Sequence, residues 1–377
     1  MSSPVSPSTT TIVALSGGVD SAVAALRLRD AGHHVQCLHM TNWEDDGYCN
    51  AAADVQDARR VCQVLGLPLH RVNFASEYRE QVFAQFLAEH GKGRTPNPDV
   101  LCNREIKFGV MRRYAQRLGA TWLATGHYAR VVAADGRPQL HKGVDPTKDQ
   151  SYFLHSVHED DLAQSLFPLG DLVKSEVRAI ARAAGLPVAA KKDSTGICFI
   201  GERPFAEFLS RYLPDSPGVI RDDAGRERGT HRGLAFYTLG QRHGLHIGGR
   251  ADAAEQPWYV ARKDAERNEL VVVQGNDHPW LLQNWLAASA VHWINGAPRP
   301  WADGTVLRCH AKIRYRQADQ PCSVVRVGDD ALEVSFDRPQ RTPAPGQYVV
   351  FFDGSRCLGG AVIERAETRA AALAAAG

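Results

Sequence analysis

Hydrophobic and polar positions follow two alternating rhythms along the first third of the chain. Short apolar runs predict strands at Thr11–Leu15, Val35–Met40, Leu69–Asn73 and Trp122–Ala124. Apolar residues spaced three and four apart predict helices at Asp20–Asp30, Ala51–Leu65, Tyr78–His90 and Ile106–Leu118. Repeated strand–helix units are typical of a parallel sheet with helices on both faces, so we expect a doubly wound α/β domain.

The pattern stays helical after this region and then becomes irregular. Leu162–Phe167 and Lys174–Ala184 are predicted helices, and Lys191–Gly201 is a predicted loop. A short predicted helix, Pro204–Arg211, leads into the proline-containing stretch Pro214–Pro217, which is a plausible end for the first domain.

Beyond Pro217 the pattern becomes one of short β-rich runs separated by turn residues. The predicted strands are Pro257–Val260, Glu269–Val273, Thr305–Ile313, Cys322–Val327, Leu332–Phe336 and Tyr348–Phe352. They suggest two small β-barrels that divide near Leu281–Ser289. We therefore expect a disordered tail (1–10), a catalytic α/β domain (11–213), a central β-rich domain (214–285) and a C-terminal β-barrel (286–377).

Composition narrows the class of protein. Of the 377 residues, 44% are hydrophobic and 23% are charged, as in a soluble globular protein. The net charge of +2 means that any RNA site must be a local basic patch. The chain contains no bilayer-length apolar run, and its first ten residues lack the features of a signal peptide, so we expect a cytoplasmic protein without membrane association.

Cysteine spacing argues against a metal site. The eight cysteines include no C-x-x-C pair, so we expect neither a tightly bound metal nor an iron–sulfur cluster. In the cytosol these cysteines are mostly reduced, and each is either core filler or a reactive thiol. Core filler is the interpretation for Cys37, Cys62, Cys309, Cys322 and Cys357, and Cys49 is left undecided.

The segment Ser16-Gly17-Gly18-Val19-Asp20-Ser21 lies between a predicted strand and a predicted helix. Its glycines free backbone N–H groups, its serines add hydroxyl donors, and the helix N-terminus favours anions, so it predicts a phosphate cradle. It lacks the G-x-x-x-x-G-K-[ST] pattern of an ordinary P-loop. The structural alternative is a Gly-Gly turn in which Asp20 or Ser21 caps the helix.

Two further segments should lie beside this loop, because ligands of doubly wound domains bind at the carboxyl ends of the strands. Met40 ends the second predicted strand and could pack on adenine, and Gly126 follows the Trp122–Ala124 strand and could let a ribose or base approach. Taken alone, each residue is better explained by a structural role than by contact with a ligand.

Cys102 and Cys198 differ from the other cysteines, because both lie in predicted loops rich in Gly, Pro, Asp and Asn. Cys102 falls near the start of a predicted helix, where the thiolate is favoured. Asp99, three residues earlier, would oppose that effect but could accept a proton from a substrate. Cys198 follows Lys191 and Lys192 in the predicted loop.

At this point the sequence resembles a known family, the bacterial tRNA-specific 2-thiouridylases. The matching stretches include SGGVDS (16–21), NWEDDGYC (42–49), TPNPDVLCN (95–103) with REIKFG, ATGHYAR (124–130), KDQSYFL (148–154), DSTGICFIGER (193–203), LGQRHGL, KIRYRQ (312–317) and PGQYVVFFDG (345–354). They run in the family's order from about Ile12 to Ile363. Leu15 and Ala22 depart from residues often found there, and neither change removes a needed polar group.

The resemblance implies roles for individual residues. ATP would be bound by Ala14, Leu15, Ser16, Gly17, Gly18, Val19, Asp20, Ser21, Met40 and Gly126. The target base would face Asn97, Pro98 and Asp99. Transfer RNA would be contacted by His127, Lys148, Asp149, Gln150, Arg314, Tyr315 and Gln347. Cys198 would carry a persulfide received from a sulfur-relay protein or a cysteine desulfurase, and Cys102 would be the second nucleophile, which pairs transiently with Cys198 in a disulfide.

The implied reaction is 2-thiolation of wobble uridine 34 in the tRNA anticodon loop. ATP, with Mg²⁺ neutralising its phosphates, would adenylate the C2 oxygen so that AMP can leave. Either the persulfide of Cys198 attacks C2 directly, or Cys102 first releases sulfide from it, and the sequence leaves both routes open. Asp99 is the candidate general base in either route.

Three rival interpretations use parts of the same pattern. A small-molecule adenylating ligase or amidotransferase would explain the phosphate loop, but not the two cysteines. A non-catalytic RNA-binding protein would explain the stretch from Lys312 to Arg316, where an alternating strand would put Arg314 and Arg316 on one face and Tyr315 on the other. A thiolase for another nucleotide would share the loop, although such enzymes that rely on C-x-x-C ligation do not fit this sequence.

Overall fold

The structure, a computed structural model, describes residues 9–43, 51–193, 204–247, 256–298 and 304–376. Its first domain is built on five parallel strands. Their order across the sheet is β3 (Leu69–Asn73), β2 (His34–Thr41), β1 (Thr10–Ala14), β4 (Trp122–Ala124) and β7 (Ser165–Leu166). The predicted parallel α/β sheet is therefore confirmed.

Helices cover both faces of this sheet because successive side chains of each strand point to opposite sides. One face packs on α1 (Val19–Asp30), α2 (Ala51–Leu65) and α9 (Lys174–Ala183). The other packs on two long helices, each with a π-helical centre. The first consists of α3 (Ala75–Tyr78), η1 (Arg79–Phe83) and α4 (Ala84–Gly91), and the second of α5 (Pro98–Leu101), η2 (Cys102–Met111) and α6 (Arg112–Arg117).

One local prediction in this domain is corrected, and one hairpin was not predicted. Leu162–Phe167 is not a helix, because α8 (Glu159–Leu162) ends there and the chain continues as strand β7. A hairpin of β5 (Ala129–Ala134) and β6 (Arg137–Lys142) was not predicted. Its signal was present in the turn Asp135-Gly136, where both residues have positive φ (52° and 73°) as two-residue hairpin turns require.

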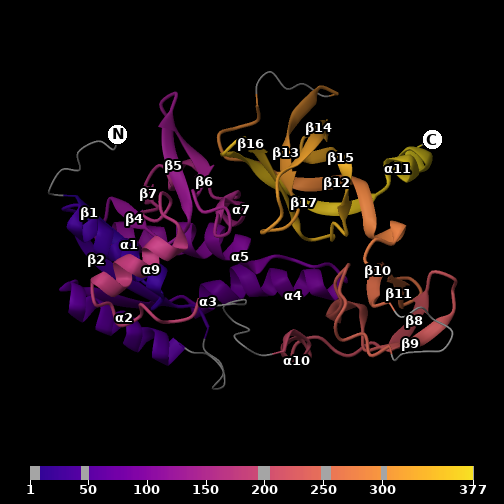
Figure 1. The fold of residues 1–377 in the computed structure, drawn as a ribbon, viewed down its shortest axis with the longest axis horizontal. Coiled ribbons are helices and arrows are strands. Elements are labelled where there is room, and N and C mark those ends of the chain that lie inside the picture. The colour runs from indigo at the N-terminus through magenta and orange to yellow at the C-terminus, as the bar shows by residue number, and fades with distance from the viewer. Residues whose placement is uncertain (1–8, 44–50, 194–203, 248–255, 299–303, 377) are drawn as a thin grey trace.

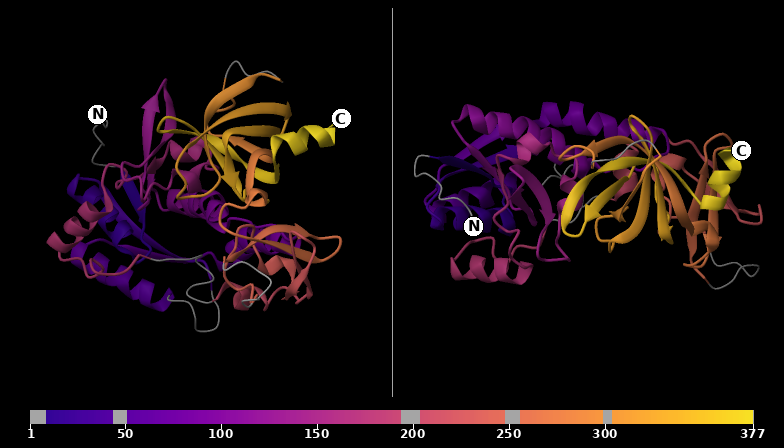
Figure 2. Two further views of the ribbon diagram at one scale, coloured as in Figure 1. Left: turned by 45° about the vertical axis from the view of Figure 1, so that its right-hand side comes forward. Right: turned by 90° about the horizontal axis from the view of Figure 1, so that it is seen from above.

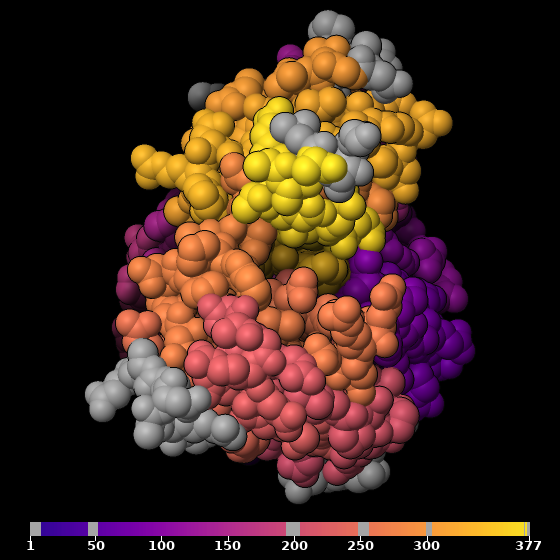
Figure 3. Space-filling model, turned by 90° about the vertical axis from the view of Figure 1, so that its right-hand side faces the viewer, coloured from indigo at the N-terminus to yellow at the C-terminus, as the bar shows by residue number. Residues whose placement is uncertain are grey.

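The second half forms two β-structures. The central one is a four-stranded sheet in the order β10 (Trp258–Asp264), β11 (Glu269–Gln274), β8 (Gly218–Asp222) and β9 (Glu227–His231), preceded by α10 (Phe205–Leu209). Figure 3 shows it lying below the C-terminal β-structure, with the first domain behind both.

The C-terminal structure is a closed six-stranded barrel, since β12 pairs with both β15 and β17. Its strands are β12 (Leu282–Trp293), β13 (Val306–Lys312), β14 (Gln320–Gly328), β15 (Ala331–Arg341), β16 (Tyr348–Asp353) and β17 (Arg356–Glu367). Helix α11 (Arg369–Ala376) follows the barrel.

The three parts of the chain are joined by direct contacts (Figures 1 and 2). Strand β6 of the first domain pairs with β17 of the barrel, through His141 and Arg356. The α3–α4 helix runs from the parallel sheet to the central sheet, where Lys263 Nζ donates to the Gly93 carbonyl at 2.7 Å.

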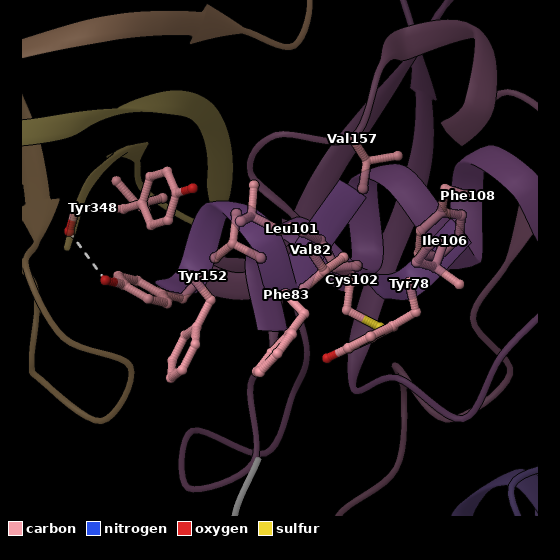
Figure 4. Close-up of a cluster of buried hydrophobic side chains, with 14 of the residues drawn as sticks. Tyr78, Val82, Phe83, Leu101, Cys102, Ile106, Phe108, Tyr152, Val157 and Tyr348 are labelled. Atoms are coloured by element: carbon pink, nitrogen blue, oxygen red, sulfur yellow. Dashed lines mark hydrogen bonds between the residues drawn. The ribbon is translucent and has the colours of Figure 1, made fainter. Parts of the chain in front are cut away.

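Tyr152, in α7 (Ser151–Leu154), fastens the first domain to the barrel. Its side chain is 1% exposed, and its hydroxyl group lies 3.0 Å from the Tyr348 carbonyl and 3.4 Å from the Ile313 carbonyl (Figure 4). One hydroxyl group of the first domain thus lies within hydrogen-bond distance of carbonyl groups from two barrel segments, and the shorter contact is the one to Tyr348.

We expect Tyr152→Phe to lower the free energy of unfolding by about 1 kcal/mol, because the bond from the buried hydroxyl group to the barrel is lost. Urea unfolding followed by fluorescence measures this change. Tyr114→Phe is the matched control, since the structure gives the Tyr114 hydroxyl group no hydrogen bond to any described residue. Equal stability of the two variants would contradict the assignment.

Candidate active site

The predicted phosphate loop lies between the end of β1 at Ala14 and the start of α1 at Val19. Gly17 has φ +83°, and a Cβ there would come within 2.5 Å of the Asp54 carbonyl oxygen, so the turn requires glycine. Ser21 Oγ accepts from the Ser16 N–H group at 3.1 Å and donates to the Gly18 carbonyl at 3.2 Å. These bonds hold the loop open at the N-terminus of α1, where an anion is favoured.

Two lysines from distant parts of the sequence point their ammonium groups at this loop. Lys191 Nζ lies 3.0 Å from the Gly17 carbonyl and 2.7 Å from carboxylate oxygens of both Asp54 and Asp57. Lys174 Nζ lies 2.7 and 2.8 Å from the two carboxylate oxygens of Asp20. Backbone N–H groups and two cations at one loop fit a polyphosphate such as that of ATP.

Asp193 extends this cluster toward the predicted RNA contacts. Its carboxylate accepts from Lys174 at 2.8 Å, from Arg178 at 2.8 Å and from Lys148 at 2.6 Å. Burial alone would raise the pKa of Asp193, but the bonds from Lys148 and Lys174 outweigh it and lower that pKa to about 2. Asp193 is therefore ionised across the working pH range of an enzyme.

Sequence reasoning missed Lys174, Asp193 and Tyr128 as members of the site. Tyr128 donates to Asp20 at 2.7 Å, from a position 108 residues away. Lys174 reaches the same carboxylate from the first position of α9, 154 residues along the chain. No local pattern marks such partners, because the sheet topology alone brings them together.

Of the residues predicted to lie beside the loop, Gly126 is in contact with it. A Cβ on Gly126 would come within 2.8 Å of the Ser21 nitrogen and 2.9 Å of the Asp20 carbonyl carbon, so this glycine packs directly on the start of α1. Met40 is half-buried near the carboxyl end of β2. His127 is 7% exposed, and burial lowers its pKa well below the usual range, so the ring is neutral.

The segment predicted to face the target base forms a helix start. Asn97 caps α5 by accepting from the Asp99 N–H group at 3.2 Å, and Pro98 occupies the first turn. Asp99 is half-buried, and burial raises the pKa of its carboxyl group while the nearby Lys107 ammonium opposes that rise. A raised pKa makes this carboxylate a stronger base.

Cys102 is corrected from a loop residue to a helical one. It lies at the junction of α5 and η2, one turn inside the helix that begins at Pro98, and it is 3% exposed. Figure 4 shows its side chain in the apolar cluster with Tyr78, Val82 and Ile106. Cys198 lies outside the described residues.

The predicted RNA-contacting stretch of the barrel is corrected as well. Strand β13 ends at Lys312, and Arg314, Tyr315 and Arg316 form a turn, so the alternation expected of a strand does not apply. Arg314 donates to the Thr342 carbonyl at 3.0 Å and to its hydroxyl group at 2.7 Å.

The remaining predicted RNA contacts make intramolecular bonds. The Tyr315 hydroxyl group donates to the Lys148 carbonyl at 3.2 Å. Asp149 is 5% exposed and accepts from Gly143 and Ser151. The Gln150 amide oxygen accepts from the Tyr128 N–H group at 3.0 Å.

In the described part of the chain, no cluster of three His, Cys, Asp or Glu side chains has the arrangement of a metal site. Among the same residues, no helix has the length and apolarity needed to cross a membrane.

Comparisons with known proteins match all three parts of the chain. The tRNA methyl transferase HUP domain matches residues 9–202, the tRNA methyl transferase PRC-barrel domain residues 206–274, and the aminomethyltransferase beta-barrel domain residues 283–363.

Curated relatives match along nearly the whole chain. The tRNA-specific 2-thiouridylase MnmA of Methylococcus capsulatus is 57% identical over 94% of this chain and 95% of its own length. That of Pseudomonas fluorescens Pf-5 is 55% identical over 94% of both chains. A solved 4-thiouridine synthetase–RNA complex with bound ATP has a TM-score of 0.34 at 18% identity, over 54% of this chain and 50% of that chain, which is too low to support an inference.

We expect Gly126→Ala to weaken ATP binding about tenfold or more, because the added Cβ meets backbone atoms of Asp20 and Ser21 that have little room to move. Calorimetric titration with a non-hydrolysable ATP analogue measures the affinity. Gly91→Ala is the matched control, since a Cβ at Gly91 has nothing within 4 Å. If both variants bind like the unchanged protein, the phosphate loop is not the ATP site.

Proposed function

Because the chain belongs to the tRNA-specific 2-thiouridylase family, we propose that it uses ATP to replace the C2 oxygen of wobble uridine 34 in tRNA with sulfur. The observation that carries this proposal is the pair of ammonium groups, Lys174 and Lys191, held at a glycine-rich loop by fixed carboxylates. The domain boundaries at 213/214 and 285/286 remain part of the proposal.

ATP binding is assigned to the phosphate loop and its neighbours. Backbone groups from Ala14 to Ser21 would hold the phosphates, with Met40 and Gly126 beside the nucleoside. Mg²⁺ would neutralise phosphate charge next to Asp20 when it is bound. Lys174 and Lys191 would exchange carboxylate partners for phosphate oxygens, a charge-assisted contact of similar strength.

The target uridine is assigned to the segment from Asn97 to Asp99. The base must leave the anticodon stack to reach a partly buried carboxylate, and single-stranded loops permit this. The C2 oxygen then attacks the α-phosphorus of ATP, and the bond to pyrophosphate breaks. Asp99 would take the N3 proton as the oxygen gains its bond to phosphorus.

Sulfur transfer is assigned to Cys198 and Cys102. The terminal sulfur of a Cys198 persulfide attacks C2, and AMP leaves with the former uridine oxygen. The Cys102 thiolate then attacks the inner sulfur, so that the S–S bond of the persulfide breaks and the terminal sulfur stays on the base. The product Cys102–Cys198 disulfide is reopened by a cytosolic dithiol reductant. In the alternative order, Cys102 releases hydrosulfide, which attacks C2.

Partners follow from this chemistry. The RNA would be held by His127, Lys148, Asp149, Gln150, Arg314, Tyr315 and Gln347, of which Lys148 and Arg314 carry the positive charge. A sulfur-relay protein or a cysteine desulfurase would load Cys198. We place the enzyme in the cytoplasm, together with its tRNA substrate.

The direct test is to incubate the protein with Mg-ATP, a persulfide donor and an unmodified tRNA whose anticodon begins with uridine. Mass spectrometry of the digested RNA should show 2-thiouridine for the unchanged protein, and none for Cys198→Ser or Cys102→Ser. Cys309→Ser, on barrel strand β13, is the control that should keep activity. Release of AMP with a small carboxylate but not with tRNA would favour the adenylating-ligase alternative.

A second prediction concerns Asp99 as the base. Because a base acts only when it is ionised, kcat should fall as the pH drops through the raised pKa of Asp99. Lys107→Met removes the positive charge that lowers this pKa, so the pKa should rise further and the loss of activity should begin at a higher pH. Asp99→Asn should lose most activity at every pH while it still binds ATP.

The pH–rate profile of Arg59→Met provides the control, since Arg59 is an exposed cation on α2. An identical acid limb in Lys107→Met and the unchanged protein would remove Asp99 from the role of general base.

A further inference from the structure

One turn of the barrel lies against the segment that leads to Asp99 and Cys102. The turn connects β15 to β16 and contains Pro345, Gly346 and Gln347, which we call the barrel turn. The Thr95 N–H group donates to the Pro345 carbonyl at 2.8 Å, and this bond joins two backbones 250 residues apart.

Both the nitrogen and the oxygen of the Gln347 side-chain amide form hydrogen bonds with the same segment. Its nitrogen donates to the Thr95 carbonyl at 2.9 Å and to the Pro96 carbonyl at 3.3 Å. Its oxygen lies 3.4 Å from the Asn97 side-chain nitrogen. Three successive residues before the helix are therefore held by one side chain, although the resemblance assigned Gln347 only to RNA.

The barrel turn is itself rigidly held. The Gly346 N–H group donates to the Ile363 carbonyl at 2.8 Å, and the Ile363 N–H group donates to the Gln347 carbonyl at 2.8 Å, so the turn is bonded to strand β17 from both sides. The neighbouring Arg94–Glu364 ion pair adds a second tie between β17 and the chain just before Thr95.

Gly346 allows the two backbones to approach. Its φ of +90° lies in the region that favours glycine, and a Cβ there would come within 3.0 Å of the Thr95 nitrogen and 3.1 Å of the Thr95 carbonyl carbon. A Cβ at this position would require one of the two backbones to shift by a few tenths of an ångström, because the atoms that it meets belong to the backbone and not to the end of a flexible side chain.

We infer that the barrel turn is a positioning element for the reaction, and that Gly346 and Gln347 set the place of Asn97, Asp99 and Cys102. Asn97 caps the helix that carries Asp99 and Cys102, so a displacement of residues 95–97 moves the start of that helix. Residues that fix reacting groups within a fraction of an ångström affect the rate more than they affect binding. The contacts between the barrel turn and residues 95–97 exist whatever reaction the protein catalyses, while the expected effect on kcat rests on the proposed thiolation.

The test compares Gly346→Ala with Gly354→Ala. Gly354 also has positive φ (+56°) and belongs to the same barrel, but a Cβ there has nothing within 4 Å, so this control carries the backbone strain without the contact. We expect Gly346→Ala to lower kcat for 2-thiouridine formation about 10- to 100-fold, with KM for tRNA unchanged within about twofold. Gly354→Ala should keep both constants.

A second readout does not depend on activity. Hydrogen–deuterium exchange of the peptide that contains Thr95, followed by mass spectrometry on the protein without RNA, should be faster in Gly346→Ala and in Gln347→Met than in the unchanged protein and Gly354→Ala. Gln347→Met keeps the length of the side chain and removes its amide, so it should share the loss of kcat.

Two outcomes overturn the inference. One is unchanged exchange at Thr95 in both Gly346→Ala and Gln347→Met. The other is an unchanged kcat combined with a higher KM for tRNA in Gln347→Met, which would leave Gln347 as an RNA contact alone. If the unchanged protein makes no 2-thiouridine, the proposed function fails, while the exchange rates still decide whether the barrel turn holds the segment.

Discussion

The arrangement of the nucleotide site depends on the two ion pairs that the ammonium group of Lys174 forms. This ammonium group lies between the carboxylates of Asp20, in the phosphate loop, and Asp193, the last described residue before the segment that contains Cys198. Without this cation two carboxylates would face one another at the mouth of an anion site, which is electrostatically unfavourable. The same contact gives α9 a fixed position, because Lys174 is its first residue.

The two halves of the site differ in polarity. The nucleotide half consists of charged groups whose partners are themselves charged, so ligands can exchange there at small cost. Cys102 lies in an apolar cluster and is 3% exposed, which keeps its thiol away from solvent oxidants and from unrelated electrophiles. A thiol in such a place reacts only when the helix that carries it moves or when a neighbouring segment opens.

Much of the catalytic domain was predictable because its signals are local. The alternation of apolar runs and helical stripes predicted β1 to β4 and α1, and Ser16–Ser21 predicted the loop between them. The burial of Cys102 inside a helix was not predictable, because the proline and asparagine residues before it are typical of a loop, whereas here they begin and cap a helix. The partners of Asp20 were also hidden, since Tyr128 and Lys174 meet it only through the sheet topology. The turn at Arg314 was mistaken for a strand because its charges alternate with an aromatic residue in the same way.

The hairpin of β5 and β6 has a consequence for synthesis of the protein. Its partner strand in the barrel, β17, begins at Arg356, which is 215 residues after its pairing partner His141. At ribosomal rates of roughly 5–20 residues per second, β17 is synthesised about ten to forty seconds after β6, and until then the outer edge of β6 has no partner strand. An unpaired strand edge can add a strand from another chain. Charged side chains on an edge strand disfavour such pairing, and Arg137, His141 and Lys142 supply basic side chains along β6.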